Sequence, residues 1–170
     1  MIIKDINQIP KIINVIDELN KKRVQIGILG DDSKEPSILM IATVQEYGVN
    51  ITVTDKMRAF LHYQGLHLKD STTEIKIPER SFIRAGWDTA KEDTQKVITK
   101  LLPSVLKLNM SVNDFYEIIG NYVVGKLHEY VDLISEPALH PFTIERKGST
   151  HPLIDTGRLN QAITYQVVNN

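Results

Sequence analysis

The chain has 170 residues, 42% of them hydrophobic and 24% charged, with a formal net charge of −1. That length suffices for one domain with its own core, and the near-neutral charge provides no overall field that would attract nucleic acid. The absence of cysteine excludes disulfides, thiolate nucleophiles and cysteine-based metal sites. The longest strictly apolar run, Ile38 to Ala42, is far shorter than the roughly 20 residues of a membrane helix. We therefore expect a single domain over residues 1–170, with neither membrane nor sequence-specific nucleic-acid binding.

Helical and extended patterns alternate through the first half of the chain. Isoleucines recur at helical spacing before residue 22, and a nearly alternating strand pattern follows them. Gly48 and Gly65 stand where two short helices should end, and Pro78 should stop a strand. The expected elements are a helix from about 8 to 22, a strand over 24–29, a helix over 37–47, a strand over 51–53, a helix over 54–65 and a strand over 74–77.

Two long helical patterns dominate the second half. The first runs from Ser81 to about Leu108 and contains Pro103, which should kink or break the helix near Lys100 because an interior proline removes a hydrogen bond. The second runs from a capping Ser111 to Ile134, and such neighbours pack antiparallel or lie together on a sheet. With a final strand over 162–168, the sequence predicts an α+β fold: two long helices packed on a small, mainly antiparallel sheet, with shorter helices and one long loop.

Few side chains group in a pattern typical of catalysis. His62 and His67 are five residues apart, which is the wrong spacing for two ligands on one helical face. The chain contains neither a nucleophile-elbow pattern nor a phosphate-binding glycine pattern. We expect no enzyme, no cofactor and no metal. The alternative is a small metal-dependent hydrolase that uses Asp31, Asp32 and a histidine, although an acidic turn is the commoner explanation of that pair.

The stretch Lys147 to Val167, KGSTHPLIDTGRLNQAITYQV, contains a loop, a helical turn and a strand. Asp155 or Thr156 should cap the short helix by accepting a backbone N–H, and Gly157 should permit the tight turn into it. The residues before it, 136–151, contain two prolines and little periodicity, which predicts a long loop.

Several stretches resemble, in order, those of one family of bacteriophage proteins. They are Glu46-Tyr47-Gly48; KMRAFL over residues 56–61; IPERSFIR over residues 77–84, where Ser81 replaces the second proline of the family; and KGS over 147–149 followed by PLIDTGRL over 152–159. The family is that of the head–tail joining and tail-completion (neck) proteins of tailed bacteriophages, also described as virion-morphogenesis or tail-component proteins.

The resemblance implies a structural virion protein with no catalysis and no cofactor. Such proteins act as ring-forming adaptors of the neck, present in the virion and, during assembly, in the host cytoplasm. The implied partners are other virion proteins, namely the neck connector and the tail tube or tail terminator, together with further copies of the chain. A minor tail assembly protein is the alternative within the same virion.

The resemblance also marks candidate structural or partner-contact residues. Arg158 is expected to pair with Asp155 or Glu79, and residues 135–153 to form a long loop or arm that contacts a neighbouring subunit. The candidate residues are Pro78, Glu79, Arg80, Lys147, Gly148, Ser149, Pro152, Leu153, Ile154, Asp155, Thr156, Gly157, Arg158 and Leu159.

Overall fold

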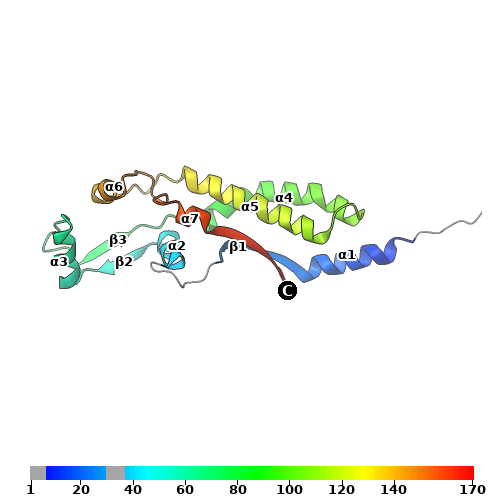
Figure 1. The fold of residues 1–170 in the computed structure, drawn as a ribbon, viewed down its shortest axis with the longest axis horizontal. Coiled ribbons are helices and arrows are strands. Elements are labelled where there is room, and N and C mark those ends of the chain that lie inside the picture. Colours follow the sequence, from blue (N-terminus) through cyan, green and yellow to red (C-terminus); the bar gives the residue numbers. More distant parts are fainter. Residues whose placement is uncertain (1–6, 30–36) are drawn as a thin grey trace, which may run out of the picture.

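The structure is a computed structural model that describes residues 7–29 and 37–170. These residues form an elongated α+β body with long helices, as the sequence predicts (Figure 1). The elements are α1 (Ile9–Lys21), β1 (Lys22–Ile28), α2 (Ile38–Tyr47), β2 (Val49–Thr52), α3 (Asp55–Tyr63), β3 (Glu74–Ile77), α4 (Arg84–Leu106), α5 (Val112–Leu133), α6 (Pro141–Lys147), α7 (Arg158–Gln161) and β4 (Ile163–Asn169).

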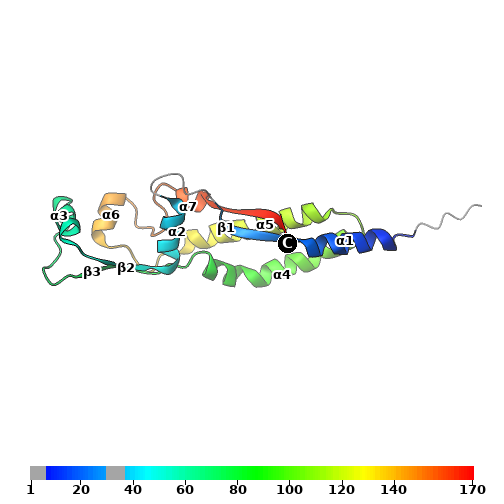
Figure 2. The same cartoon turned by 90° about the horizontal axis from the view of Figure 1, so that it is seen from below.

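Helix α5 lies at the centre of the core. It packs against α4 on one side and under the antiparallel ribbon of β1 and β4 on the other (Figure 2). Its buried stripe recurs at helical spacing, which is why the sequence pattern predicted this helix well. The buried positions on it are Val112, Phe115, Ile119, Gly120, Val123, Leu127 and Val131.

The strands form two separate antiparallel pairs. In the first pair, β1 and β4 run from Lys22 opposite Asn169 to Ile28 opposite Ile163. Along β4, Ile163 and Tyr165 are buried or half-buried while Thr164 between them is exposed, as the alternating sequence pattern predicts. The second pair, β2 and β3, lies apart from the first and has four residues in each strand.

Local helix signals in the sequence are confirmed, but the effect of Pro103 is not. The Ser111 hydroxyl accepts a hydrogen bond from the Asp114 backbone N–H at 3.0 Å, and Thr54 caps α3 in the same way. Helix α4 is not broken near Lys100, since it continues through Pro103 to Leu106. The proline lies in the last turn of α4. Only a few residues of helix follow it, so the hydrogen bond that it removes does not divide α4 into two helices.

The expected long loop over residues 135–153 is wrong in its middle, because α6 lies there. Pro141 occupies the first turn, which tolerates proline, and Gly148 ends the helix in the left-handed conformation at φ +70°. A seven-residue helix between a proline and a glycine is too short to reveal a period in the sequence. The same segment is tied to the body by Arg80, which donates to the carbonyls of Pro137 and Ala138, so it is not a free arm. Its contact with a neighbouring subunit stays a prediction.

Residues 49–79, which we name the β2–α3–β3 projection, extend from one end of the molecule, and α1 extends from the other (Figures 1 and 2). No residue of the projection is buried. The molecule therefore has a packed middle, built on α4, α5 and the β1–β4 ribbon, and two poorly covered ends.

Replacing Gly120 with alanine should destabilise the fold. A Cβ atom at this position would lie 2.2 Å from the ring of Tyr165, so α5 and β4 would have to move apart. Overpacking of this kind costs about 1–3 kcal/mol of unfolding free energy, measurable by urea denaturation. Gly125→Ala is the control, because nothing lies within 4 Å of its Cβ position on the same helix. That variant should gain about 0.5–1 kcal/mol; equal effects at the two positions would contradict the described packing.

Candidate functional site

A buried carboxylate at the end of α2 caps the first turn of α4. Glu46 is 5% exposed, and its oxygens accept hydrogen bonds from the backbone N–H groups of Phe82 at 2.8 Å, Ile83 at 2.9 Å and Arg84 at 3.0 Å. The Ser81 hydroxyl donates to the same carboxylate at 2.8 Å. The first N–H groups of a helix have no partner within it, and α4 has no capping side chain of its own. Glu46, although distant in sequence, therefore acts as the N-terminal cap of α4.

The same carboxylate is paired with Arg84. The guanidinium donates from Nε to Glu46 at 3.0 Å and from Nη2 to the Glu46 carbonyl at 2.9 Å and to Glu79 at 2.7 Å. It also lies 4.5 Å from the centre of the Tyr47 ring. Burial raises the pKa of Glu46, but the hydrogen bonds from Ile83, Arg84 and Ser81 outweigh it and hold the pKa below its ordinary value.

Arg80 joins three parts of the chain. It is 5% exposed and donates from Nε to the carbonyl of Pro137 at 2.8 Å and from Nη2 to the carbonyl of Ala138 at 3.3 Å. Nη1 donates to the Gln45 side chain at 3.2 Å, and the Arg80 backbone N–H donates to the Gln45 carbonyl at 2.7 Å. A single buried cation therefore ties α2, the segment before α4 and the segment before α6 to one another.

Gly48 allows the two chain segments to touch through their backbones. It adopts φ +67°, and a Cβ there would lie 2.8 Å from the Glu79 nitrogen and 2.9 Å from the Ile77 carbonyl oxygen. Pro78 is half-buried beside it, with its carbonyl carbon 3.2 Å from the same point. The Glu46-Tyr47-Gly48 and IPERSFIR stretches are thus in direct contact, and only glycine fits between them.

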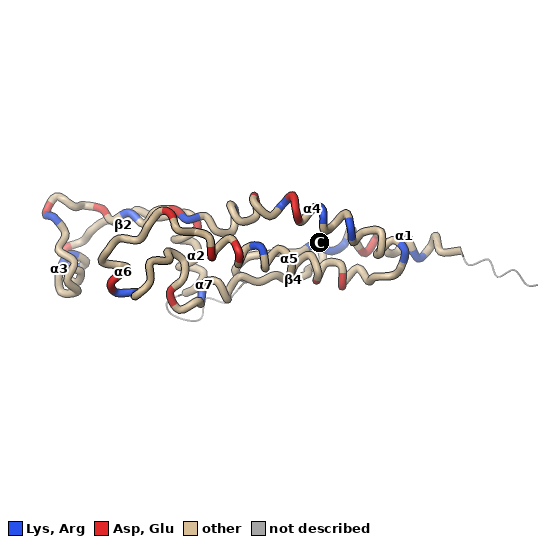
Figure 3. The backbone as a smooth tube through the Cα atoms, turned by 90° about the horizontal axis from the view of Figure 1, so that it is seen from above, with Lys and Arg blue, Asp and Glu red and all other residues tan. Residues whose placement is uncertain are grey.

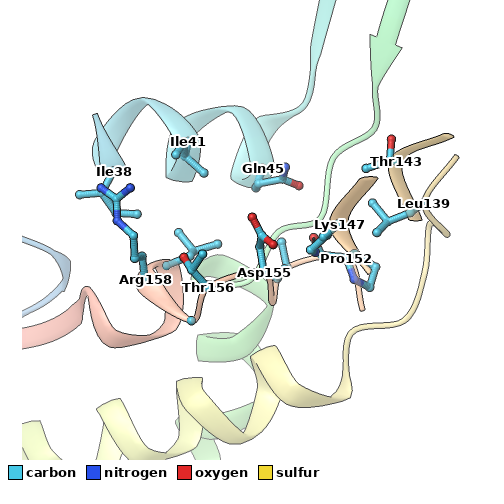
Figure 4. Close-up of a pocket in the computed structure, with 13 residues that line it drawn as sticks. Ile38, Ile41, Gln45, Leu139, Thr143, Lys147, Pro152, Asp155, Thr156 and Arg158 are labelled. Carbon is cyan, nitrogen blue, oxygen red and sulfur yellow. Dashed lines mark hydrogen bonds between the residues drawn. The ribbon is translucent and has the colours of Figure 1, made fainter. Parts of the chain in front are cut away.

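The two stretches KGS over 147–149 and PLIDTGRL over 152–159, which we name the C-terminal signature, fold back on α2. They border an open cavity of about 340 Å³ (Figure 4). Lys147 holds the loop by donating to the carbonyls of His151 at 2.5 Å and Pro152 at 3.2 Å. Gly148 ends α6, and the Ser149 hydroxyl accepts from the His151 N–H at 3.2 Å. Burial lowers the pKa of Lys147, which means that it disfavours the charged form of the side chain. The hydrogen bonds to the two carbonyls stabilise that charged form.

The remaining signature residues divide into anchors and cavity residues. Leu153 and Leu159 are buried in the main core, and Ile154 packs against it. Asp155 and Arg158 are exposed where they line the cavity. The cavity is lined by Ile38, Ile41 and Gln45 of α2, Leu139, Thr143, Lys147, and all the residues from Pro152 to Leu159 except Ile154.

Two expected roles within the signature are wrong. Neither Asp155 nor Thr156 caps α7, whose N-cap is Gly157 at φ +77° with no side-chain hydrogen bond. In the part of the chain that the structure describes, Arg158 forms no ion pair with Asp155 or Glu79. Glu79 is paired with Arg84 instead. In Figure 4 the Arg158 side chain extends toward Ile38, whereas the Asp155 carboxylate points toward Gln45.

The side chains of this site hold the surrounding segments together through hydrogen bonds and packing. Over residues 7–29 and 37–170, no group of three or more histidine, aspartate or glutamate side chains is arranged to hold a metal ion. His62 and His67 are in contact, with their Nδ1 atoms 2.8 Å apart on the exposed projection. Asp31 and Asp32 lie outside the described residues. Within the same ranges, no helix is both long enough and apolar enough to cross a membrane.

The sequence did not lead us to predict the roles of two residues of this site, Gln45 and Glu46. We quoted Glu46 only for its resemblance and did not single out Gln45 as a binding partner. One signal was present: Glu46 follows Ala42 by one helical turn, so a glutamate stands on the buried face of α2. A charged residue on a buried face requires partners, which points to a hydrogen-bonded role.

No family model, curated protein or solved structure matches the chain.

Glu46→Ala should lower the unfolding free energy by about 3 kcal/mol, because it leaves buried N–H groups of α4 and the Arg84 guanidinium without their partner. Thermal or urea denaturation measures the change. Glu92→Ala is the control, since Glu92 is an exposed carboxylate on α4 and its loss should change stability by no more than about 0.5 kcal/mol. A loss at Glu46 as small as at Glu92 would refute the capping role.

The contribution of Glu46 should also depend on pH. Because its pKa is lower in the folded chain than its ordinary 4.5, the stabilisation is present above that value and is lost as pH falls through the folded pKa. The difference in unfolding free energy between the wild type and Glu46→Gln should therefore shrink on acidification from neutral pH. Taking the difference removes the contribution of the other carboxyl groups. A difference that stays constant with pH would mean that the ionised form is not what stabilises α4.

Proposed function

We propose that the protein is a structural virion protein of a tailed bacteriophage or prophage, acting as a tail-completion or head–tail adaptor in the neck. The resemblance suggests this role, and the geometry is compatible with it. The stretches over 46–48 and 77–84 contact each other at the end of α2, and the stretch over 152–159 packs along the same helix. Most of the stretches that resemble one family thus form one connected structural unit, whereas KMRAFL over residues 56–61 lies apart from it on α3.

The observation that carries the proposal is the amount of exposed surface. The 19.3-kDa chain exposes 11,741 Å², whereas a compact monomer of that mass exposes about 8,500 Å². If the 13 residues outside the described ranges are set aside at the roughly 165 Å² of an unfolded residue each, about 9,600 Å² is left for the other 157 residues. That is about 1,600 Å² more than the roughly 8,000 Å² of a compact monomer of their own mass. A standard interface takes about 800 Å² from each partner, and a ring subunit has two neighbours. The excess therefore matches a subunit that is completed by assembly.

The surface also suits protein partners better than a nucleic acid. Figure 3 shows lysine and arginine interspersed with aspartate and glutamate along the whole body. A nucleic-acid-binding face would gather the basic residues on one side. In the neck, this surface would meet the connector on one side and the tail on the other.

Particles assembled without the protein should accumulate as filled heads and separate, complete tails. Adding the purified protein should join them, which electron microscopy and infectivity both measure. Gly125→Ala, which leaves every described contact in place, should join them equally well, whereas Glu46→Ala should join fewer particles in proportion to its unfolded fraction.

Joined, infectious particles made without the protein would overturn the proposal. Short or absent tails in place of separate, complete ones would instead favour the alternative of a minor tail assembly protein.

A further inference from the structure

Helix α1 presents a row of isoleucines that nothing in the described chain covers. Ile9 is 63% exposed, Ile13 52% and Ile16 44%. Their spacing of four and three residues places them on one face of the helix. A neighbouring face of α1 is used within the chain, where Val15 and Leu19 pack against the core. The chain thus covers only part of the apolar side of α1 and leaves the isoleucine face exposed.

The opposite end of the molecule has an unfilled apolar groove. It lies between the β2–α3–β3 projection and the segment leading into α6, and its volume is about 520 Å³. That size lies within the roughly 300–1,000 Å³ that is typical of ligand-binding pockets. The apolar lining comes from Leu66, Leu68, Ile75, Ile77, Leu139 and Phe142.

We infer that the isoleucine face of α1 in one copy of the chain docks in this groove of the next copy. An apolar helix face laid in an apolar groove is a recurring mode of protein recognition. The helix and the groove lie at opposite ends of an elongated molecule (Figures 1 and 2). The contact is therefore head-to-tail, and repetition of one such contact generates a ring when the rotation closes.

We assign a second copy of the chain as the occupant because the same chain contains both the exposed helix face and the apolar groove. The charges agree: Asp17 is exposed next to the isoleucine row, and Lys76 lines the groove. The area of the whole chain agrees as well, since its excess surface of about 1,600–3,200 Å² equals two or more interface sides of standard size. The inference deepens the proposed function, on which its biological meaning rests.

Cysteine cross-linking tests the contact directly, because the natural chain has no cysteine. Ile13→Cys and Leu139→Cys variants, one with a longer affinity tag, are mixed at high concentration and treated with a short bismaleimide. We expect the tagged–untagged heterodimer to exceed by at least tenfold the product of either variant with Thr99→Cys, an exposed position on α4. Adding Ile16→Asp to the Ile13→Cys variant should lower the yield to the control level. Asn14→Asp, an exposed position elsewhere on the same helix, should leave the yield unchanged.

A heterodimer yield equal to the Thr99→Cys control would overturn the inference. So would a stronger product of Ile13→Cys with itself, which would mean that α1 closes on another α1. Circular dichroism and thermal melting establish that each variant is folded. Because cross-linking uses the purified protein and particle joining uses virions, the docking contact and the proposed neck function can fail separately.

Discussion

The structure depends on one buried carboxylate. An ionised side chain inside a protein is unfavourable unless its oxygens are fully bonded, and Glu46 meets that condition with donors from Ser81, Phe82, Ile83 and Arg84. The bonds fix where α4 begins relative to α2. Arg80, two residues before Phe82, holds the segment before α6, and Gly48 lets the projection leave the body beside it.

This arrangement separates the residues that build the molecule from those that are free to meet a partner. Most of the stretches that resemble neck proteins are occupied internally: Glu79 binds Arg84, Lys147 binds loop carbonyls, and Leu153 and Leu159 lie in the core. The uncovered apolar surface lies elsewhere, on α1 and in the groove beside the projection. Resemblance in sequence thus marks the scaffold, and in our proposal the uncovered apolar surface makes the contacts.

Much of the fold was predictable because its signals are local. The stripe on α5, the Ser111 cap and the alternation in β4 each act within a few residues, so a single sequence reveals them. The site was not predictable to the same extent. Glu46 acts on residues 35 to 38 positions away and Arg80 on residues 57 and 58 positions away, and no periodicity encodes such pairings. The expected break at Pro103 and the overlooked α6 were wrong for a related reason: the effect of a proline depends on its position in the helix.

The central claim is that this chain is an incomplete body whose surface is finished by further copies of itself. The most direct measurement is the mass of the purified protein by light scattering over a concentration series. The account predicts a discrete multimer whose mass stops increasing once the ring is closed. A mass that stays at 19.3 kDa up to the highest attainable concentration would contradict it.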